Sequence, residues 1–183
     1  MQLVFFLEEA SAKALLQELL PRFLPNIETP LFIVFEGKQD LEKQLTRKLR
    51  NWQCPKSCFV VLRDKDSGNC YEIKEKLRKL SHESGHPQTL IRIACRELES
   101  WYLGDLAAVE QALNARGAVK QQANQKFRNP DKLGNPVQEL MRLAPSYQKI
   151  SGSRAMGKVM KREGNTSHSF NVFIKGIISI LKS

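Results

Sequence analysis

The chain has 183 residues and a mass of 20.9 kDa, and it is 42% hydrophobic and 26% charged. This composition is typical of one globular domain and excludes wholesale disorder, while no apolar run approaches the roughly 20 residues that cross a bilayer. The apolar start of the chain is short and is followed at once by two glutamates. We therefore expect no signal peptide, no membrane association and a cytoplasmic location.

The net charge of +10 is unevenly distributed along the chain. Residues 1–99 hold 16 Lys and Arg against 14 Asp and Glu, whereas residues 100–183 hold 13 against 5. A basic second half beside an acid-bearing first half indicates a polyanionic partner that meets an acidic site. Solubility alone explains the same charge, so the charge does not decide between the two.

Four cysteines are expected to be reduced thiols in such a location. The pair Cys54 and Cys58 has a spacing that some zinc sites use, but no second close pair and no nearby histidine completes such a site. Cys58 and Cys95 lie within apolar runs, where cysteine behaves as a small core residue. We expect no metal site built on thiolates.

Four short apolar runs, rich in β-branched and aromatic residues, predict strands that are buried on both faces. They start 28, 27 and 31 residues apart, about the length of a β–α–β unit. The runs are Leu3–Leu7, Leu31–Phe35, Cys58–Leu62 and Thr89–Ala94. The segments between them have apolar residues at helical spacing and predict helices at Ser11–Leu20, Asp40–Trp52 and Asn69–Leu80. The pattern predicts an α/β fold with a mainly parallel four-stranded sheet flanked by helices.

The pattern changes beyond the fourth run. A helix is expected at Trp101–Leu113, and residues 114–136 are polar, basic and interrupted by glycine and proline, which predicts a long loop. Further helices are expected at Val137–Leu143, Met156–Lys161 and Ser169–Leu181. We therefore predict an α/β domain over residues 1–113, with residues 114–183 forming a basic loop and helical extension that packs on the same domain.

Carboxylates follow every predicted strand. Because the carboxyl ends of parallel strands share one edge of a sheet, these side chains are expected to meet where ligands of such sheets bind. Two charges about 4 Å apart repel by roughly 4 kcal/mol at an effective dielectric near 20, a cost that a divalent cation removes. Oxygen ligands favour Mg²⁺ or Mn²⁺. The alternative is that such acids cap the following helices, as Glu9 and Glu36 can. The acids are Glu8, Glu9, Glu36, Asp64, Asp66, Glu97 and Glu99.

The order of these acids resembles the Toprim domain of topoisomerases, primases and related nucleases. A lone glutamate ends the first strand, and an Asp-x-Asp pair, Asp64 and Asp66, follows two crossovers later. The sequence EEASA from Glu8 resembles the E-G-x-S-D turn of that domain, with Glu9 where glycine is usual. The pair Glu36-Gly37 is an alternative match, but in a flavodoxin-like strand order the first strand is the neighbour of the third, which favours Glu8.

A closer resemblance covers nearly the whole chain. The segments FVVLRDKD, IRIACRELESWYLGDLAAV, RNPDKL, YQKISGSRAMG and NTSHSF resemble a bacterial Toprim-like family without assigned function. Members of that family are often encoded beside AAA or ABC-type ATPases in phage-defence (abortive-infection) loci. The resemblance implies an antiviral defence role with an ATPase partner.

The resemblance to Toprim nucleases implies hydrolysis of a phosphodiester with one or two Mg²⁺ or Mn²⁺ ions. Glu8, Asp64 and Asp66 would hold the metal, with Glu97 as a favoured further ligand and Glu99 as a possible one. Such nucleases also use a late lysine as the cation that stabilises the transition state. Lys149, Lys158 and Arg154 lie in YQKISGSRAMGK, which is alternatively a solvated basic loop.

The basic residues of the second half predict contacts with nucleic-acid backbones rather than base reading, because few aromatic residues accompany them. The candidates are Lys126, Arg128, Lys132 and Arg154. Three functions remain open at this point. The chain is a metal-dependent nuclease that acts with an ATPase, a noncatalytic subunit that binds nucleic acid or the ATPase, or a Mg²⁺-dependent phosphotransfer enzyme for a nucleotide or small phosphoester.

Overall fold

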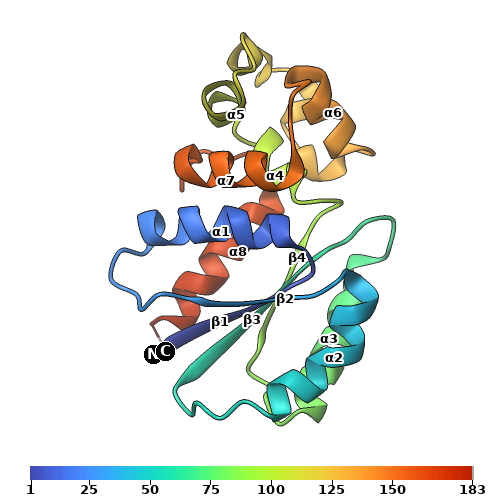
Figure 1. Cartoon of the computed structure of the whole chain (residues 1–183). Coiled ribbons are helices and arrows are strands. Elements are labelled where there is room, and N and C mark those ends of the chain that lie inside the picture. Colours follow the sequence, from blue (N-terminus) through green and yellow to red (C-terminus); the bar gives the residue numbers. More distant parts are fainter. Residues whose placement is uncertain (183) are drawn as a thin grey trace.

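The computed structural model describes residues 1–182 and has a four-stranded parallel sheet at its centre (Figure 1). The strands are β1 (Gln2–Leu7), β2 (Leu31–Val34), β3 (Ser57–Asp64) and β4 (Leu90–Ala94), in the order β2-β1-β3-β4. The predicted α/β fold class, a parallel sheet flanked by helices in a Rossmann-like, Toprim-type arrangement, is confirmed. The first strand is indeed the neighbour of the third, with the second strand outside.

Helices cover both faces of the sheet. Helices α1 (Ala10–Phe23) and α8 (His168–Ile180) lie on one face, and α2 (Lys38–Arg50) and α3 (Cys70–Glu83) lie on the other (Figure 1). Successive side chains of β1 point to opposite faces of the sheet. Phe5 belongs to the core beneath α1 and α8, and Phe6 belongs to the core beneath α2 and α3. None of the helices within residues 1–182 is long and apolar enough to span a membrane.

A helical cap, residues 99–159, stands on the carboxyl ends of the strands (Figure 1). It contains α4 (Glu99–Leu103), α5 (Leu106–Leu113), α6 (Pro136–Leu143) and α7 (Lys149–Val159), with short 3₁₀ turns at Ala118–Gln121, Gln125–Phe127 and Pro130–Lys132. Two sequence-based expectations differ here. Residues 114–136 contain these three turns rather than a plain loop. The helix expected at Trp101–Leu113 is broken, because the side chain of Asp105 accepts a hydrogen bond from the backbone N–H of Ala108 (3.1 Å) and so begins a new helix.

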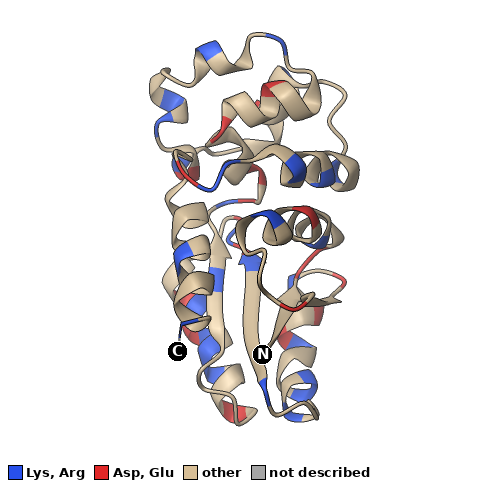
Figure 2. Cartoon of the chain, turned by 90° about the vertical axis from the view of Figure 1, so that its left-hand side faces the viewer, with Lys and Arg blue, Asp and Glu red and all other residues tan. Residues whose placement is uncertain are grey.

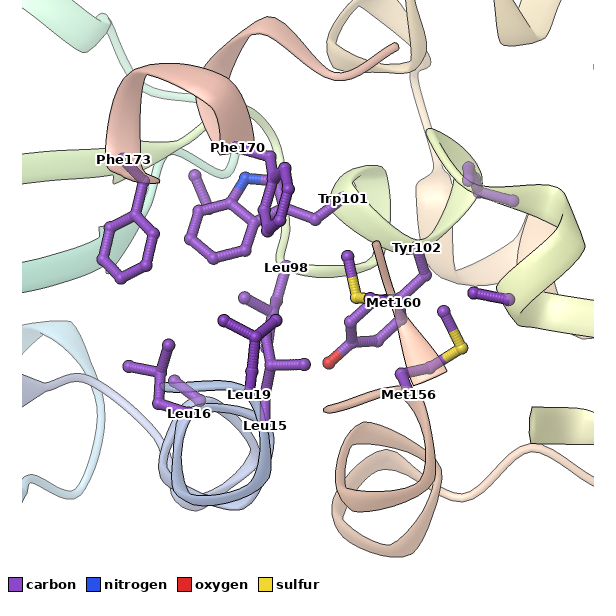
Figure 3. Packing of buried hydrophobic residues seen from close by; sticks show 14 of the residues in the cluster. Leu15, Leu16, Leu19, Leu98, Trp101, Tyr102, Met156, Met160, Phe170 and Phe173 are labelled. Atoms are coloured by element: carbon purple, nitrogen blue, oxygen red, sulfur yellow. The ribbon is translucent and has the colours of Figure 1, made fainter. Parts of the chain in front are cut away.

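The basic stretch expected as a short helix or a solvated loop forms the eleven-residue helix α7. Helix α7 packs against α1 because Gly157 lets the two backbones approach closely. A Cβ atom at Gly157 would lie 2.4 Å from the carbonyl oxygen of Leu15. Figure 3 shows Leu15, Trp101, Tyr102 and Met156 in the cluster that joins α1, α4 and α7. Packing on α1 therefore fixes the position of the basic residues on α7.

Replacing Gly157 by alanine is expected to lower the free energy of unfolding by about 1–3 kcal/mol, because the added methyl group meets a backbone oxygen that cannot move freely. Urea denaturation followed by circular dichroism measures this difference. Gly134→Ala is the control, since a Cβ there has open space around it, and should change the stability by no more than about 0.5 kcal/mol. Equal effects of the two substitutions would contradict this account of the α1–α7 contact.

Candidate functional site

Glu8 lies at the carboxyl end of β1, beside the end of β3. It is 8% exposed, and its Oε2 atom accepts a hydrogen bond from the backbone N–H of Asp64 at 3.1 Å. This contact follows from the strand order, because Leu7 pairs with Leu62 in the register of β1 with β3. The early glutamate and the first aspartate of the Asp-x-Asp pair therefore meet at the centre of the sheet edge.

Asp64 is surrounded by other carboxylates. Burial, and then the negative charges of Glu99, Glu8 and Glu9, raise the pKa of Asp64 well above its ordinary value, and Lys149 only partly opposes this. Burial also raises the pKa of Glu8. We call Glu8, Glu9, Asp64, Glu99 and Lys149 the carboxylate site. Figure 2 shows acidic and basic residues together where the strands end beneath the helical cap.

Glu99 is the most deeply buried member of the carboxylate site, with no exposed surface. Its Oε1 atom accepts a hydrogen bond from the Tyr147 hydroxyl at 2.8 Å, whereas its Oε2 atom is buried and has no hydrogen-bond partner among residues 1–182. Burial raises the pKa of Glu99. An unpartnered buried carboxylate oxygen is costly, and it is the group expected of a site that receives a ligand.

Two cations accompany these acids. The Nζ atom of Lys149, in the first turn of α7, pairs with Oε2 of Glu9. Burial lowers the pKa of Lys149, but the hydrogen bond and charge of Glu9 and the charges of Glu99 and Asp64 more than offset this and raise it overall. On the other side, Nε of Arg63 lies 3.8 Å from Oε2 of Glu8, and its guanidinium also pairs with Glu42.

A small cavity opens between these groups. Glu8, Glu9, Ser11, Arg63 and Asp64 line it together with Ala12, Leu62 and Leu98, and its volume of about 10 Å³ is close to the space that one water molecule needs. A single ion fits this volume but a substrate does not, so any substrate must bind outside it.

Three other predicted site residues make their contacts outside the carboxylate site, although the charge of Asp66 contributes to the raised pKa of Glu8. Asp66 has a left-handed backbone (φ 53°), and its Oδ2 atom pairs with Nζ of Lys38 at 2.7 Å. Glu97 accepts a hydrogen bond from the backbone N–H of Val137 at 3.3 Å, near the start of α6. Lys158 is exposed near the end of α7. The structure thus places Glu99, rather than Glu97, beside Asp64, and Lys149, rather than Lys158, beside the acids.

The alternative first acid, Glu36, is exposed, and its backbone N–H donates to Asp40 at 3.1 Å. It therefore lies at the start of α2 and does not line the cavity. This arrangement agrees with the expectation that Glu8, rather than Glu36, is the acid nearest the Asp-x-Asp pair. Glu9, considered as a possible helix cap, makes no capping hydrogen bond to α1 and pairs with Lys149 instead.

The residues proposed to contact nucleic acid lie on the helical cap. Lys126 pairs with Glu139 at 2.8 Å, and Arg128 donates to the carbonyl oxygen of Ala123 at 3.3 Å. Lys132 and Arg154 are exposed, the latter on α7. These cations are spread over several elements of the cap rather than gathered in one pocket.

Sequence reasoning overlooked two residues of this region. Arg63 is a buried charge at the end of an otherwise apolar strand, and that position in the run FVVLRD is the signal that could have identified it. Tyr147 hydrogen-bonds Glu99 across the cap, and no spacing in the sequence indicates that contact.

Within residues 1–182, no three Asp, Glu, His or Cys side chains are assembled as a metal site. The donor set still suits Mg²⁺ or Mn²⁺, because Mg²⁺ usually binds one or two protein carboxylates and completes its shell with water and substrate phosphates. Glu8 and Asp64 supply two such carboxylates, and Glu99 Oε2 is an unused oxygen nearby.

In EDTA, the free energy of unfolding of the wild-type protein is expected to fall more steeply above about pH 4 than that of Asp64→Asn. The folded state raises the pKa of Asp64 above its ordinary value of 3.8, so the carboxyl group holds its proton more tightly in the folded protein than in the unfolded one. This difference favours folding at low pH, and its contribution to the free energy of unfolding is lost as the pH rises through the folded pKa. Urea denaturation of both proteins between about pH 4 and 8 measures the slopes. Parallel slopes would show that Asp64 is not in a repulsive environment.

A family model described as a domain of unknown function (DUF4276) matches residues 7–178. The matched range includes every member of the carboxylate site. No curated protein and no solved structure matches the chain significantly.

Proposed function

The chain belongs to the DUF4276 family, and we propose that it is a divalent-metal-dependent phosphodiesterase, a nuclease of the Toprim type. The observation that carries this proposal is the meeting of Glu8 and Asp64 at the centre of the parallel sheet edge. Glu99 adds a third acid, fully buried, whose charge acts on Asp64. Acids gathered in this way repel one another, and a bound divalent cation would remove this repulsion because it attracts each carboxylate.

In this proposal Glu8 and Asp64 hold the metal ion at the small cavity. When bound, the ion would polarise the phosphate and lower the pKa of an attacking water. Lys149, at the solvent side of the acids, is placed to bind a non-bridging phosphate oxygen and to stabilise the charge that develops there. Glu99 lies buried behind these groups, where its charge acts on Asp64, and Tyr147 fixes the orientation of its carboxyl group.

The substrate and partners proposed for this site are a nucleic acid, DNA or RNA, and an AAA or ABC-type ATPase, in an antiviral defence role in the cytoplasm. The net charge of +10 supports the first, since basic residues on the cap can contact backbone phosphates around the site. The ATPase and the defence role rest on the resemblance of the long motif RIACRELESWYLGD to the Toprim-like family described above.

A noncatalytic subunit that binds nucleic acid or the ATPase is the second candidate. It is favoured by the ion pairs Lys149–Glu9 and Lys38–Asp66, which already neutralise part of the acidic charge, and by the lack of a complete set of metal ligands within residues 1–182.

Incubation of the purified chain with supercoiled plasmid or single-stranded RNA tests the proposal. We expect nicking or cleavage with Mn²⁺ or Mg²⁺ and none in EDTA. Salt-sensitive binding without cleavage under either metal would instead support the noncatalytic subunit. Turnover of nucleotides or small phosphoesters, with DNA and RNA left intact, would identify a phosphotransfer enzyme of a different kind.

A further inference from the structure

A basic groove runs along the free edge of the sheet. Because β4 is the last strand in the order β2-β1-β3-β4, its outer edge has no neighbouring strand. A cavity of about 530 Å³ lies there, lined by residues of α3, by residues 87–92 and by Ile180 of α8. This volume falls in the range of small-ligand sites. The basic groove is named for its cationic lining residues: Lys74, Arg78, Lys79 and Arg92.

Arg92 is held firmly in this groove. Its Nε atom donates to the carbonyl oxygen of Val172 at 3.2 Å, and its Nη1 atom donates to that of Ile91 at 2.9 Å. Gly176 of α8 makes room for the guanidinium, since a Cβ atom there would lie 2.3 Å from Nη2. The Nη2 atom lies on the Gly176 side and makes no hydrogen bond to the residues that the structure describes, so contacts with α8 fix the position of the guanidinium beside the groove.

The positive charge of the groove is not balanced by its own acids. Glu75 is the acidic lining residue, and it pairs with Arg78 at 2.6 Å. Lys74 forms no ion pair with residues 1–182, and burial together with the charges of Arg78 and Arg92 lowers its pKa. Burial, followed by the charge of Arg78, likewise lowers the pKa of Arg92. Like charges that are partly desolvated repel one another, and a bound anion would relieve that repulsion.

We propose that the basic groove binds phosphate groups, with Arg92 and Lys74 as their principal ligands. A planar guanidinium and an ammonium group that line the same cavity suit phosphate oxygens, which accept several charge-assisted hydrogen bonds. The groove shares no lining residue with the small cavity of the carboxylate site. The inference therefore goes beyond the proposed function and holds whether or not the chain cleaves its ligand.

Binding measured in EDTA tests the groove without hydrolysis. Inorganic pyrophosphate is titrated by calorimetry, and a fluorescein-labelled single-stranded oligonucleotide by anisotropy. We expect Lys74→Glu to weaken pyrophosphate binding at least about tenfold, because it reverses a ligand charge. Arg92→Gln should have a similar effect, and Lys74→Glu keeps the test valid if Arg92→Gln unfolds. Lys43→Glu, an exposed charge reversal on α2, is the matched control and should bind as the wild type does.

The two probes also separate the sources of the phosphate. Loss of both pyrophosphate and oligonucleotide binding in Lys74→Glu would support the groove as a contact for a nucleic-acid backbone. Loss of pyrophosphate binding alone would support a free polyphosphate or nucleotide as its ligand. Equal weakening by Lys74→Glu and Lys43→Glu, or no binding of pyrophosphate to the wild type, would overturn the proposal.

Discussion

Asp64→Asn is expected to lower kcat/KM for metal-dependent phosphodiester cleavage about 1000-fold or more, equivalent to about 4 kcal/mol of transition-state stabilisation. Asp64 lies beside Glu8, and burial combined with three other carboxylates raises its pKa. Asparagine keeps the shape of the side chain but removes the negative charge that holds the cation. Cleavage of a labelled oligonucleotide at saturating Mn²⁺ measures the loss.

The fold should survive this substitution, because it removes a repulsive charge rather than a stabilising one. Without metal, Asp64→Asn is expected to be at least as stable as the wild type near pH 8. Added Mn²⁺ should raise the melting temperature of the wild type and leave that of the variant unchanged. These two measurements separate loss of the metal from loss of the structure.

Asp66→Asn provides the matched control for the same Asp-x-Asp pair. Asp66 pairs with Lys38 at the surface, so its loss should reduce cleavage less than about tenfold. If both aspartates matter equally, the metal lies nearer to the turn after β3 than the carboxylate site indicates. If Asp64→Asn cleaves within tenfold of the wild type, Asp64 does not hold the catalytic cation.

The sheet and its acidic edge could be predicted because local sequence determines them. The run FVVLRD has buried residues on both faces of the strand, which is typical of a parallel sheet. In such a sheet β1 and β3 end at the same edge, so Asp64 lies at the same edge as Glu8. The strand order made Glu8, rather than Glu36, the neighbour of Asp64. The shared edge follows from periodicity and the geometry of parallel crossovers, whereas the choice of Glu8 rested on a flavodoxin-like strand order that the sequence pattern alone does not determine.

The choice between Glu97 and Glu99 could not be made in this way. The two residues lie at the junction of β4 and α4, where Arg96 has a positive φ of 67°, and that backbone turn decides which carboxylate faces Asp64. The turn depends in part on the cap, because Val137 binds Glu97 and Tyr147 binds Glu99. These hydrogen bonds join residues that are 40 and 48 positions apart in the sequence, and local sequence patterns cannot predict such contacts.

The helix α7 was underestimated for a similar reason. Gly152 and Gly157 are poor helix formers and suggested an irregular basic stretch. In the structure each glycine allows a close contact, Gly152 with the Tyr147 ring and Gly157 with α1. Tertiary packing therefore outweighs the intrinsic preference, and it directs Lys149 toward the acids.

Lys149→Met is expected to lower kcat for phosphodiester cleavage about 100-fold, with a smaller change in KM. The ammonium group pairs with Glu9 and is close enough to Glu99 and Asp64 for their charges to act on its pKa. A cation in this position stabilises the charge that grows on the phosphate as the bond to the leaving oxygen breaks. Methionine keeps much of the length of the side chain and removes only that charge. Single-turnover cleavage with excess enzyme isolates the chemical step.

Lys158→Met, on the same helix but away from the acids, is the matched control and should leave kcat within about threefold of the wild type. The two variants lose the same charge, so any general weakening of nucleic-acid binding affects both and disappears at saturating enzyme. Lys149→Arg should restore part of the activity, because a positive charge at that position is what the transition state needs. Equal losses in Lys149→Met and Lys158→Met would instead mean that α7 contributes only net charge, and that the cation of the reaction lies elsewhere.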